Sequence, residues 1–277
     1  MANQKAIVAG VDGSPEAARA VEWAAADADR RKLPLRIVHV CERWGDMEQS
    51  KYCEGMLEAV ADRARLRAPG VDVTTELLSG HVVETLMGEA AVAESIVLGS
   101  RGLGGFSGML LGSVGLGVAG HADVPVVIVR EEAESERQDI AVGFDGSEDS
   151  EAALDYGREQ AVARGRRLHV VYAWHMPAGS PYAFGQATAL ADDSSANVRE
   201  RLARWRDQHP EVEVKESFLC EHPVAALIDA SRTADVVVVG SRGMGGFASA
   251  VLGSVSHGVL HHAHCPVAVV RPPLAAS

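Results

Sequence analysis

The chain has 277 residues, of which 47% are hydrophobic, 23% are charged and only 5% are aromatic, and its formal net charge is −12. This length favours one large domain or two domains of about 140 residues each. The acidic balance argues against nucleic acid or an anionic membrane as the main partner, and no apolar stretch approaches the length of a membrane span.

The first half alternates between apolar runs of strand length and stretches of helical pattern. Continuous apolar runs are typical of parallel strands that are covered on both faces. Ser14 followed by Pro15 is a well-formed helix start, and Ser147 is expected to cap the equivalent helix of the second half. The expected strands are AIVAGV, LRIVHVC, VDVTTELL, SIVLGS and VPVVIV, and the expected helices cover about 15–31, 50–67, 81–93 and 113–121.

The two halves are copies of one design. The segment from Val8 pairs with the segment from Ala141, which places Asp12 and Asp145 at the same position. Residues 98–130 pair without a gap with residues 239–271, and about 19 of these 33 positions are identical. The offset is larger in the later segment, so the second copy has extra residues around HMPAGSPYAFGQATALADD.

The repeat predicts the domain organisation and the fold class. We expect one domain over residues 1–131 and a second over 138–277, joined by a charged linker within REEAESERQ. Five strands alternating with helices in each half predict an α/β fold of two tandem doubly wound parallel-sheet sandwiches, Rossmann-like, with right-handed crossovers.

A glycine-rich loop follows the fourth expected strand of each half. It opens at Gly99 in GSRGLGGFSGMLLGS and closes at Gly112-Ser113, where the next helix begins. Ligands of such sheets bind at the carboxyl ends of strands where strand order reverses, and a helix N-terminus suits phosphate. Glycine spares the loop a Cβ where phosphate approaches, and Ser113 is expected to add a donor and to cap the helix. The loop is interpreted as a phosphate cradle.

Two familiar nucleotide motifs do not explain this loop. No G-x-x-x-x-G-K-[ST] sequence occurs, so there is no Walker lysine. The sequence GLGVAG at Gly115 fits G-x-G-x-x-G, but it lies inside an expected helix and its counterpart reads SHGVLH, so the match is interpreted as accidental.

With GVDGS at the end of the first strand, the spacing G-x2-G-x9-G-[ST] resembles the universal stress protein family in its ATP-binding branch, over nearly the whole chain and twice. The resemblance implies ATP held with Mg²⁺ between the first strand's end and the glycine loop. The residues implied to bind it are Gly10, Val11, Asp12, Val40, Leu98, Gly99, Gly102, Gly112, Ser113 and Val114 in the first half, and Gly143, Phe144, Asp145, Ala173, Val239, Gly240, Gly243, Gly253, Ser254 and Val255 in the second.

Within that set, the carboxylates Asp12 and Asp145 are expected to accept a ribose hydroxyl or to help hold Mg²⁺, and a turn residue at the helix entry is the alternative. The change from Val11 to Phe144 and from Val40 to Ala173 predicts unequal affinity of the two sites.

Other candidate residues allow two interpretations. Arg101 and Arg242 in the loops either pair with phosphate or are exposed surface arginines. His257 and His261 stand at i, i+4 and suit either a metal or the helix C-terminus, the latter being favoured. His39 is expected to be a buried core histidine, and no metal site is predicted.

The N-terminal segment MANQKAIVAGVDGS lacks the features of a signal peptide, which favours a cytoplasmic location. The cysteines show no C-x-x-C spacing, so neither a zinc ribbon nor a thioredoxin-type motif is present. We expect reduced packing residues at all four positions, which are Cys41, Cys53, Cys220 and Cys265.

Two functional hypotheses follow. The first is an ATP-binding protein of stress response or signalling that hydrolyses ATP slowly or not at all. The alternative is an adenylyl-transfer or ATP-hydrolysing enzyme of a related α/β fold; no catalytic residue is predicted, because neither half offers a loop Lys or His for that chemistry.

The last strand of each half predicts how the copies associate. VPVVIVR and CPVAVVR are apolar, and under the strand order that the family resemblance implies they would lie at a sheet edge, which invites pairing with another strand. We expect an internal pseudo-dimer in which these two strands are adjacent and antiparallel, and a homodimer of the whole chain as a further mode of association.

Overall fold

In the computed structural model, the chain forms two compact units, one of Met1–Glu132 with His264–Ser277 and the other of Ala133–Ala263. The structure describes residues 4–41, 47–103, 111–130, 138–174, 184–244 and 251–272. The proposed linker at 131–137 and the start of the expected insertion at 175–183 lie outside the described residues. The units differ from the two sequence repeats in one element, because the last strand of the second repeat belongs to the first unit.

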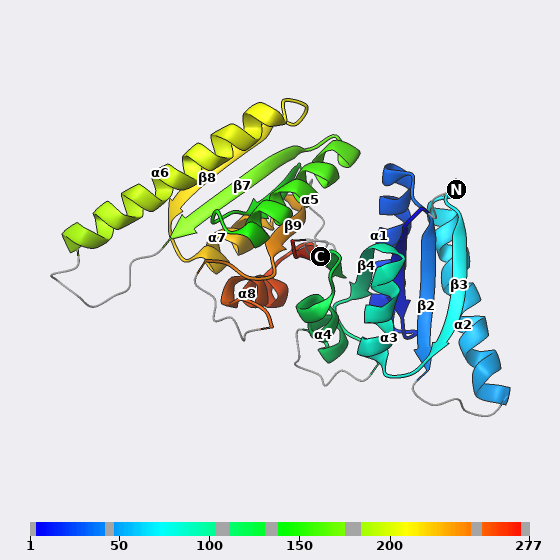
Figure 1. Ribbon diagram of the computed structural model, residues 1–277. Coiled ribbons are helices and arrows are strands. Elements are labelled where there is room, and N and C mark those ends of the chain that lie inside the picture. The colour runs from blue at the N-terminus through cyan, green and yellow to red at the C-terminus, as the bar shows by residue number, and fades with distance from the viewer. Residues whose placement is uncertain are drawn as a thin grey trace. The chain divides into compact units, whose positions relative to one another are not determined.

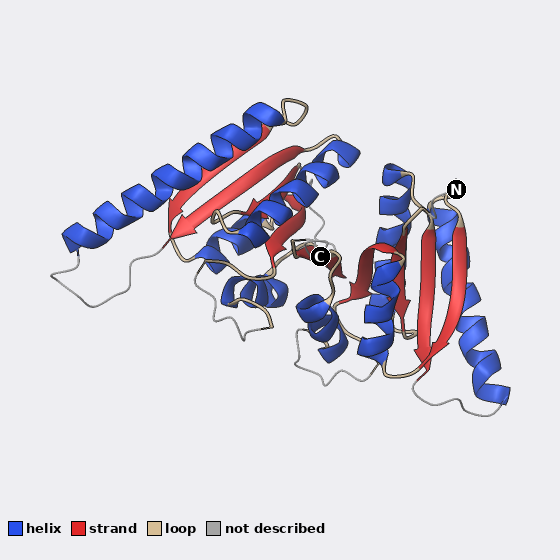
Figure 2. Ribbon diagram, in the orientation of Figure 1, coloured by secondary structure: helices blue, strands red, loops and turns tan. Residues whose placement is uncertain are grey.

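The first unit is an α/β structure around a sheet with strand order β3-β2-β1-β4-β5-β10. β1 pairs in parallel with both β2 and β4, so the strand order reverses between β1 and β4. The bounds of the strands are β1 Ala6–Val11, β2 Leu35–Cys41, β3 Val73–Ser79, β4 Ala93–Gly99, β5 Val126–Val129 and β10 Val267–Val270. Figures 1 and 2 show these strands and the helices beside them.

Helices cover both faces of this sheet, as a doubly wound fold requires. The helices are α1 Pro15–Arg31, α2 Met47–Arg67, α3 Val82–Gly88, η1 Glu89–Ala91 and α4 Ser113–His121. α1 packs against α2, and α3 packs against α4. The predicted helix at 81–93 is wrong in its extent, because the α-helix ends at Gly88, a 3-10 turn follows, and β4 begins at Ala93.

The second unit repeats the arrangement with sheet order β9-β6-β7-β8. β6 pairs in parallel with β7 and β9, so its order reverses between β6 and β9. Its elements are β6 Asp139–Gly143, α5 Glu148–Arg164, β7 Arg167–Trp174, α6 Phe184–Gln208, β8 Val214–Cys220, α7 Pro223–Ala230, β9 Ala234–Gly240 and α8 Ser254–His262.

The predicted start of the first helix of each unit is confirmed. The Ser14 hydroxyl accepts a hydrogen bond from Ala17 N, and the Ser147 hydroxyl accepts one from Ser150 N. Each hydroxyl satisfies a backbone donor that the helix leaves unpaired. The start of α1 and of α5 is therefore set by local sequence, and it lies directly after β1 and β6.

The predicted antiparallel pairing of the two last strands is present in the first unit. β10 pairs with β5 in the register Val267 to Ile128 and Val269 to Val126. β5 and β10 are buried along their length. The strand β10 thus covers an apolar edge that β5 would otherwise present to solvent.

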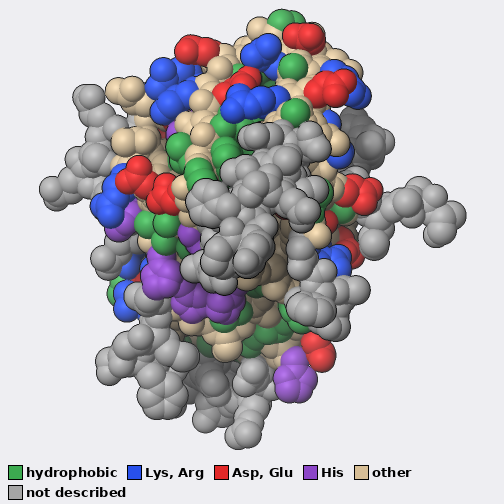
Figure 3. All heavy atoms as spheres, turned by 90° about the vertical axis from the view of Figure 1, so that its left-hand side faces the viewer, with side chains coloured by type: hydrophobic (Ala, Val, Ile, Leu, Met, Phe, Trp, Pro, Cys, Tyr) green, Lys and Arg blue, Asp and Glu red, His purple; other side chains and the backbone are tan. Residues whose placement is uncertain are grey.

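Histidine side chains gather on the face drawn in Figure 3. Ring contacts within α8 join His257 to His261, with centroids 4.6 Å apart, and His261 to His262. These histidines do not belong to the one group of potential metal ligands found among the described residues. No helix of the described chain is long and apolar enough to cross a bilayer.

Candidate functional site

Each unit has a pocket where its strand order reverses. In the first unit the pocket has a volume of about 420 Å³ and lies at the carboxyl ends of β1 and β4, in front of the N-terminus of α4. In the second unit the equivalent pocket, at β6, β9 and α8, has a volume of about 240 Å³. This is the position at which open α/β sheets bind their ligands.

All twenty residues predicted from the sequence line these two pockets, ten in each. The residues of each set come from four separate segments of their repeat, and the fold brings them together around one pocket. The first-unit set is Gly10, Val11, Asp12, Val40, Leu98, Gly99, Gly102, Gly112, Ser113 and Val114, and the second-unit set is Gly143, Phe144, Asp145, Ala173, Val239, Gly240, Gly243, Gly253, Ser254 and Val255.

The aspartate after the first strand joins the two loops of the pocket. Asp12 Oδ1 accepts a hydrogen bond from Ser14 N at 3.0 Å, and Asp12 Oδ2 accepts one from Leu103 N at 2.7 Å. In the second unit Asp145 makes the same two contacts, with Ser147 N at 2.9 Å and with Met244 N at 3.0 Å. The carboxylate therefore holds the glycine loop against the helix entry.

This aspartate explains one of the glycines. A Cβ at Gly102 would overlap Asp12 Oδ2, and one at Gly243 would lie 2.5 Å from Asp145 Oδ2. The prediction attributed such glycines to the approach of phosphate, whereas here the carboxylate itself takes the space. A Cβ at Gly99 would likewise meet the Glu16 and Ala17 backbone within 3.0 Å.

Gly112 and Gly253 have no such explanation among the described residues, which leave out 104–110 and 245–250 of the same loops. A Cβ at Gly112 would come no closer than 3.7 Å to another residue, and one at Gly253 no closer than 3.4 Å. Their backbones have φ of −77° and −69°, which any residue adopts. Both copies nevertheless have glycine at the mouth of a helix that points into the pocket.

The helix start that follows differs from the prediction in one respect. Gly112 is the N-cap of α4 and Gly253 the N-cap of α8, and neither helix has a side-chain cap. Ser113 and Ser254 are the first helical residues, so the expectation that they cap the helices is wrong. Glycine cannot supply a side-chain oxygen to the first backbone N–H groups of these helices, and these donors face the pocket with the partial positive charge of the helix end.

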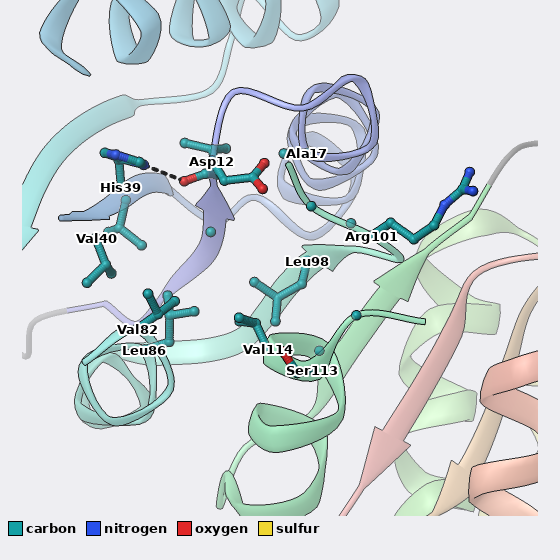
Figure 4. A pocket seen from close by; sticks show the side chains of 17 residues that line it. Asp12, Ala17, His39, Val40, Val82, Leu86, Leu98, Arg101, Ser113 and Val114 are labelled. Atoms are coloured by element: carbon teal, nitrogen blue, oxygen red, sulfur yellow. Dashed lines mark hydrogen bonds between the residues drawn. The ribbon is translucent and has the colours of Figure 1, made fainter. Parts of the chain in front are cut away.

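The opposite side of the first pocket is apolar. Figure 4 shows Val40, Val82, Leu86 and Leu98 on that side, and Asp12 away from them. Val82 and Leu86 come from α3, which the sequence reasoning did not assign to the site. Their counterparts on α7, Pro223 and Leu227, line the second pocket. The alignment of the two repeats pairs these positions, and this pairing is the sequence signal that could have identified them.

His39 also lines the first pocket, so the expectation of a core histidine is wrong. Its side chain is half-buried, and Nδ1 lies 2.7 Å from the Val11 carbonyl oxygen (Figure 4). Because that oxygen only accepts, Nδ1 carries a proton, and in the neutral imidazole Nε2 is the nitrogen with the lone pair. The equivalent position in the second unit is Tyr172, whose pKa is raised by burial and by the nearby Asp145 carboxylate.

The loop arginines take different partners in the two units. Arg101 lines its pocket and pairs with Glu16 at 3.0 Å. In the second unit the shorter Asp149 accepts from the Ser241 hydroxyl and the Arg242 backbone N–H instead. Among the described residues no carboxylate pairs with the Arg242 side chain, which lines the second pocket.

The sequence of this chain matches known proteins over nearly its whole length. The profile described as "Universal stress protein family" matches twice, over residues 4–130 and 136–271. Universal stress protein Rv1996 of Mycobacterium tuberculosis is 34% identical over 96% of this chain and 95% of its own, and universal stress protein Rv2005c of the same organism is 35% identical over 97% of both. In fold, the chain is similar to the crystal structure of a universal stress protein from Archaeoglobus fulgidus, with a TM-score of 0.75, 22% identity and coverage of 96% and 98%.

The two kinds of glycine predict different costs of substitution. Gly102→Ala displaces the Asp12 carboxylate and should destabilise the protein by about 1–3 kcal/mol, because the carboxylate loses its bond to Leu103 N. Gly112→Ala has room and an ordinary φ, so its effect should stay within about 0.5 kcal/mol. Urea unfolding of both variants beside the parent protein measures this, and equal losses would contradict the carboxylate explanation.

Proposed function

Because this chain belongs to the universal stress protein family, we propose that each of its units binds one adenine nucleotide, ATP with Mg²⁺, and that this binding serves stress response or signalling. The observation that carries the proposal is the uncapped helix N-terminus behind Gly112 and Gly253. At both positions neither packing against the described residues nor backbone conformation calls for glycine. Close approach of phosphate to the backbone does call for it.

The pocket divides into parts that suit the parts of a nucleotide. The apolar side formed by Val40, Leu86 and Leu98 suits an adenine ring. The N–H groups at the start of α4 suit the phosphates, and the Ser113 hydroxyl adds a donor beside them.

The Asp12 carboxylate can interact either with the ribose or with Mg²⁺. It is the one carboxylate among the described residues that line the first pocket, and Mg²⁺ prefers oxygen ligands. Each of its oxygens accepts one backbone N–H and keeps a second lone pair for a ribose hydroxyl or for the cation. Asp145 is placed in the same way in the second unit.

The experiment that tests the proposal is mass spectrometry of ligand released from the purified, denatured protein, followed by a titration with ATP and Mg²⁺. Gly112→Val should weaken the first site about tenfold or more, and Gly253→Val the second, because a side chain then blocks the helix N-terminus. Each variant leaves the other site as an internal control, and Gly55→Ala on α2, away from both pockets, is the matched surface control. Absence of binding at millimolar ATP would refute the proposal.

The second site should bind more weakly than the first. Phe144 replaces Val11 and is 3% exposed, and the second pocket has about 240 Å³ against about 420 Å³. Phe144→Val should raise the affinity of the second site about tenfold, at a stability cost of about 1–3 kcal/mol for the lost core volume. Calorimetric titration of this variant measures the change, with Val11→Phe as the converse. Unchanged affinity in both variants would show that this position does not set the difference.

Hydrolysis should be slower than about 1 s⁻¹. The described residues that line the pockets include no lysine, and the carboxylates of Asp12 and Asp145 are engaged by backbone N–H groups. The pockets therefore offer donors for bound phosphate, and the imidazole of His39 lies across the first pocket from Ser113 at the start of α4 (Figure 4). Phosphate release under saturating ATP measures the turnover, with the Gly112→Val/Gly253→Val double variant as the background control. Turnover well above that background and above 1 s⁻¹ would favour the enzyme alternative.

A further inference from the structure

Three potential metal ligands lie close together beside the first pocket. They are His39 and Cys41 on β2 and Cys53 on α2, and their ligand atoms all lie within 4.8 Å of one another. This is the one group of three or more potential metal ligands found among the described residues. We propose that His39, Cys41 and Cys53 form a binding site for one Zn²⁺ per chain, or for a similar thiolate-seeking cation.

The backbone brings the three side chains together by simple geometry. His39 and Cys41 are two residues apart on a strand, so both side chains project from the same face of β2. α2 packs against β2 and carries Cys53, whose side chain is 5% exposed. Two elements of one unit therefore hold all three ligands, and Cys41 is half-buried, which leaves the group open from one side.

The separation of the sulfurs fits a shared metal ion. Cys41 Sγ and Cys53 Sγ are 3.6 Å apart. Two thiolates that each lie about 2.3 Å from a tetrahedral zinc are about 3.8 Å apart, whereas a disulfide requires about 2.05 Å. Zinc enters this arrangement with a small adjustment of the side chains.

The histidine has a hydrogen bond that fixes its ring. Its Nδ1–H donates to the Val11 carbonyl oxygen at 2.7 Å, which leaves Nε2 as the basic nitrogen. Metal-bound histidines commonly use a backbone carbonyl in this way, and the bond fixes both the tautomer and the orientation of the ring. Three protein ligands leave the fourth tetrahedral position for water.

In the absence of a metal Cys41 carries a proton. Burial first, and then the neighbouring Cys53, raise the pKa of Cys41 to about 11. Zinc replaces the thiol protons of Cys41 and Cys53, and these two protons pass to the solvent, so no oxidant or reductant takes part. Affinity for the metal accordingly falls at acidic pH, where protons compete for both sulfurs.

The described residues of the second repeat include no equivalent group. Tyr172 and Trp174 stand at the positions of His39 and Cys41, and their rings stack with centroids 5.5 Å apart. Neither residue is a ligand for zinc. The site therefore belongs to the first unit alone, which predicts one metal ion per chain although the nucleotide pocket is duplicated.

The test uses the full-length, reduced chain and ZnCl₂ without nucleotide, so its outcome is independent of the proposed ATP binding. Titration against a chromophoric chelator should give one Zn²⁺ per chain with a Kd of about 1 μM or lower. Co²⁺ as a spectroscopic probe should give thiolate-to-metal charge-transfer absorption, which a site without sulfur ligands does not.

Variants identify the ligands. Cys41→Ser and Cys53→Ser should each weaken zinc binding at least about 100-fold, which exceeds the loss expected for a residue that only supports a ligand. His39→Gln should weaken zinc binding about tenfold or more. Cys220→Ser is the matched control, because Cys220 is exposed and lies in the other unit, and it should leave binding unchanged. Circular dichroism checks that each variant is folded.

Three results would overturn the proposal. They are a reduced chain that takes up no zinc, zinc binding that persists in both Cys41→Ser and Cys53→Ser, and a Co²⁺ complex without thiolate bands. If thiol counting shows that Cys41 and Cys53 form a disulfide, and the reduced protein does not bind zinc, the two cysteines are a redox pair and not a metal site.

Discussion

The carboxylate at the end of the first strand is the contact on which each pocket depends. Asp12 receives one N–H from the start of α1 and one from the glycine loop after β4, across 91 residues of sequence. Asp145 does the same across 99 residues. Charge-assisted bonds of this kind are stronger than neutral ones, so the carboxylate fixes two loops at the point where the strand order reverses.

This contact divides the glycines of the loop into two classes. Gly102 and Gly243 make room for the carboxylate, and Gly99 makes room for the start of α1. Gly112 and Gly253 make room for no other residue in the part of the chain that the structure describes, and they are N-caps without a side-chain hydrogen bond. Some glycines of the loop are therefore explained by contacts within the protein, and only Gly112 and Gly253 bear on the proposed ligand.

Duplication preserved the framework while the pockets diverged. The helix caps and the aspartate contacts recur with nearly the same distances. The residues that fill the space changed, with Phe144 in place of Val11. Position 39 holds histidine in one copy, and its counterpart Tyr172 packs beside Trp174 and Phe218 in the other. The aspartate contacts are the same in both copies, whereas the side chains that line the pockets differ.

The sequence by itself determined the features that local patterns encode. The repeat indicated two copies, apolar runs marked β1 and β2 at their observed bounds, and Ser14 and Ser147 marked helix starts. It also indicated twenty of the residues that line the pockets, because the family pattern links the strand ends to the glycine loop, but not His39, Val82 or Leu86.

Tertiary structure decided what depends on residues far apart in the chain. No local pattern shows that Gly102 faces Asp12 or that α3 closes the apolar side of the pocket. Cys41 and Cys53 lack any spacing typical of a metal motif, and only the packing of α2 on β2 brings their sulfurs to 3.6 Å. Such contacts follow from the folded backbone, since sequence spacing carries no information on which faces of two elements meet.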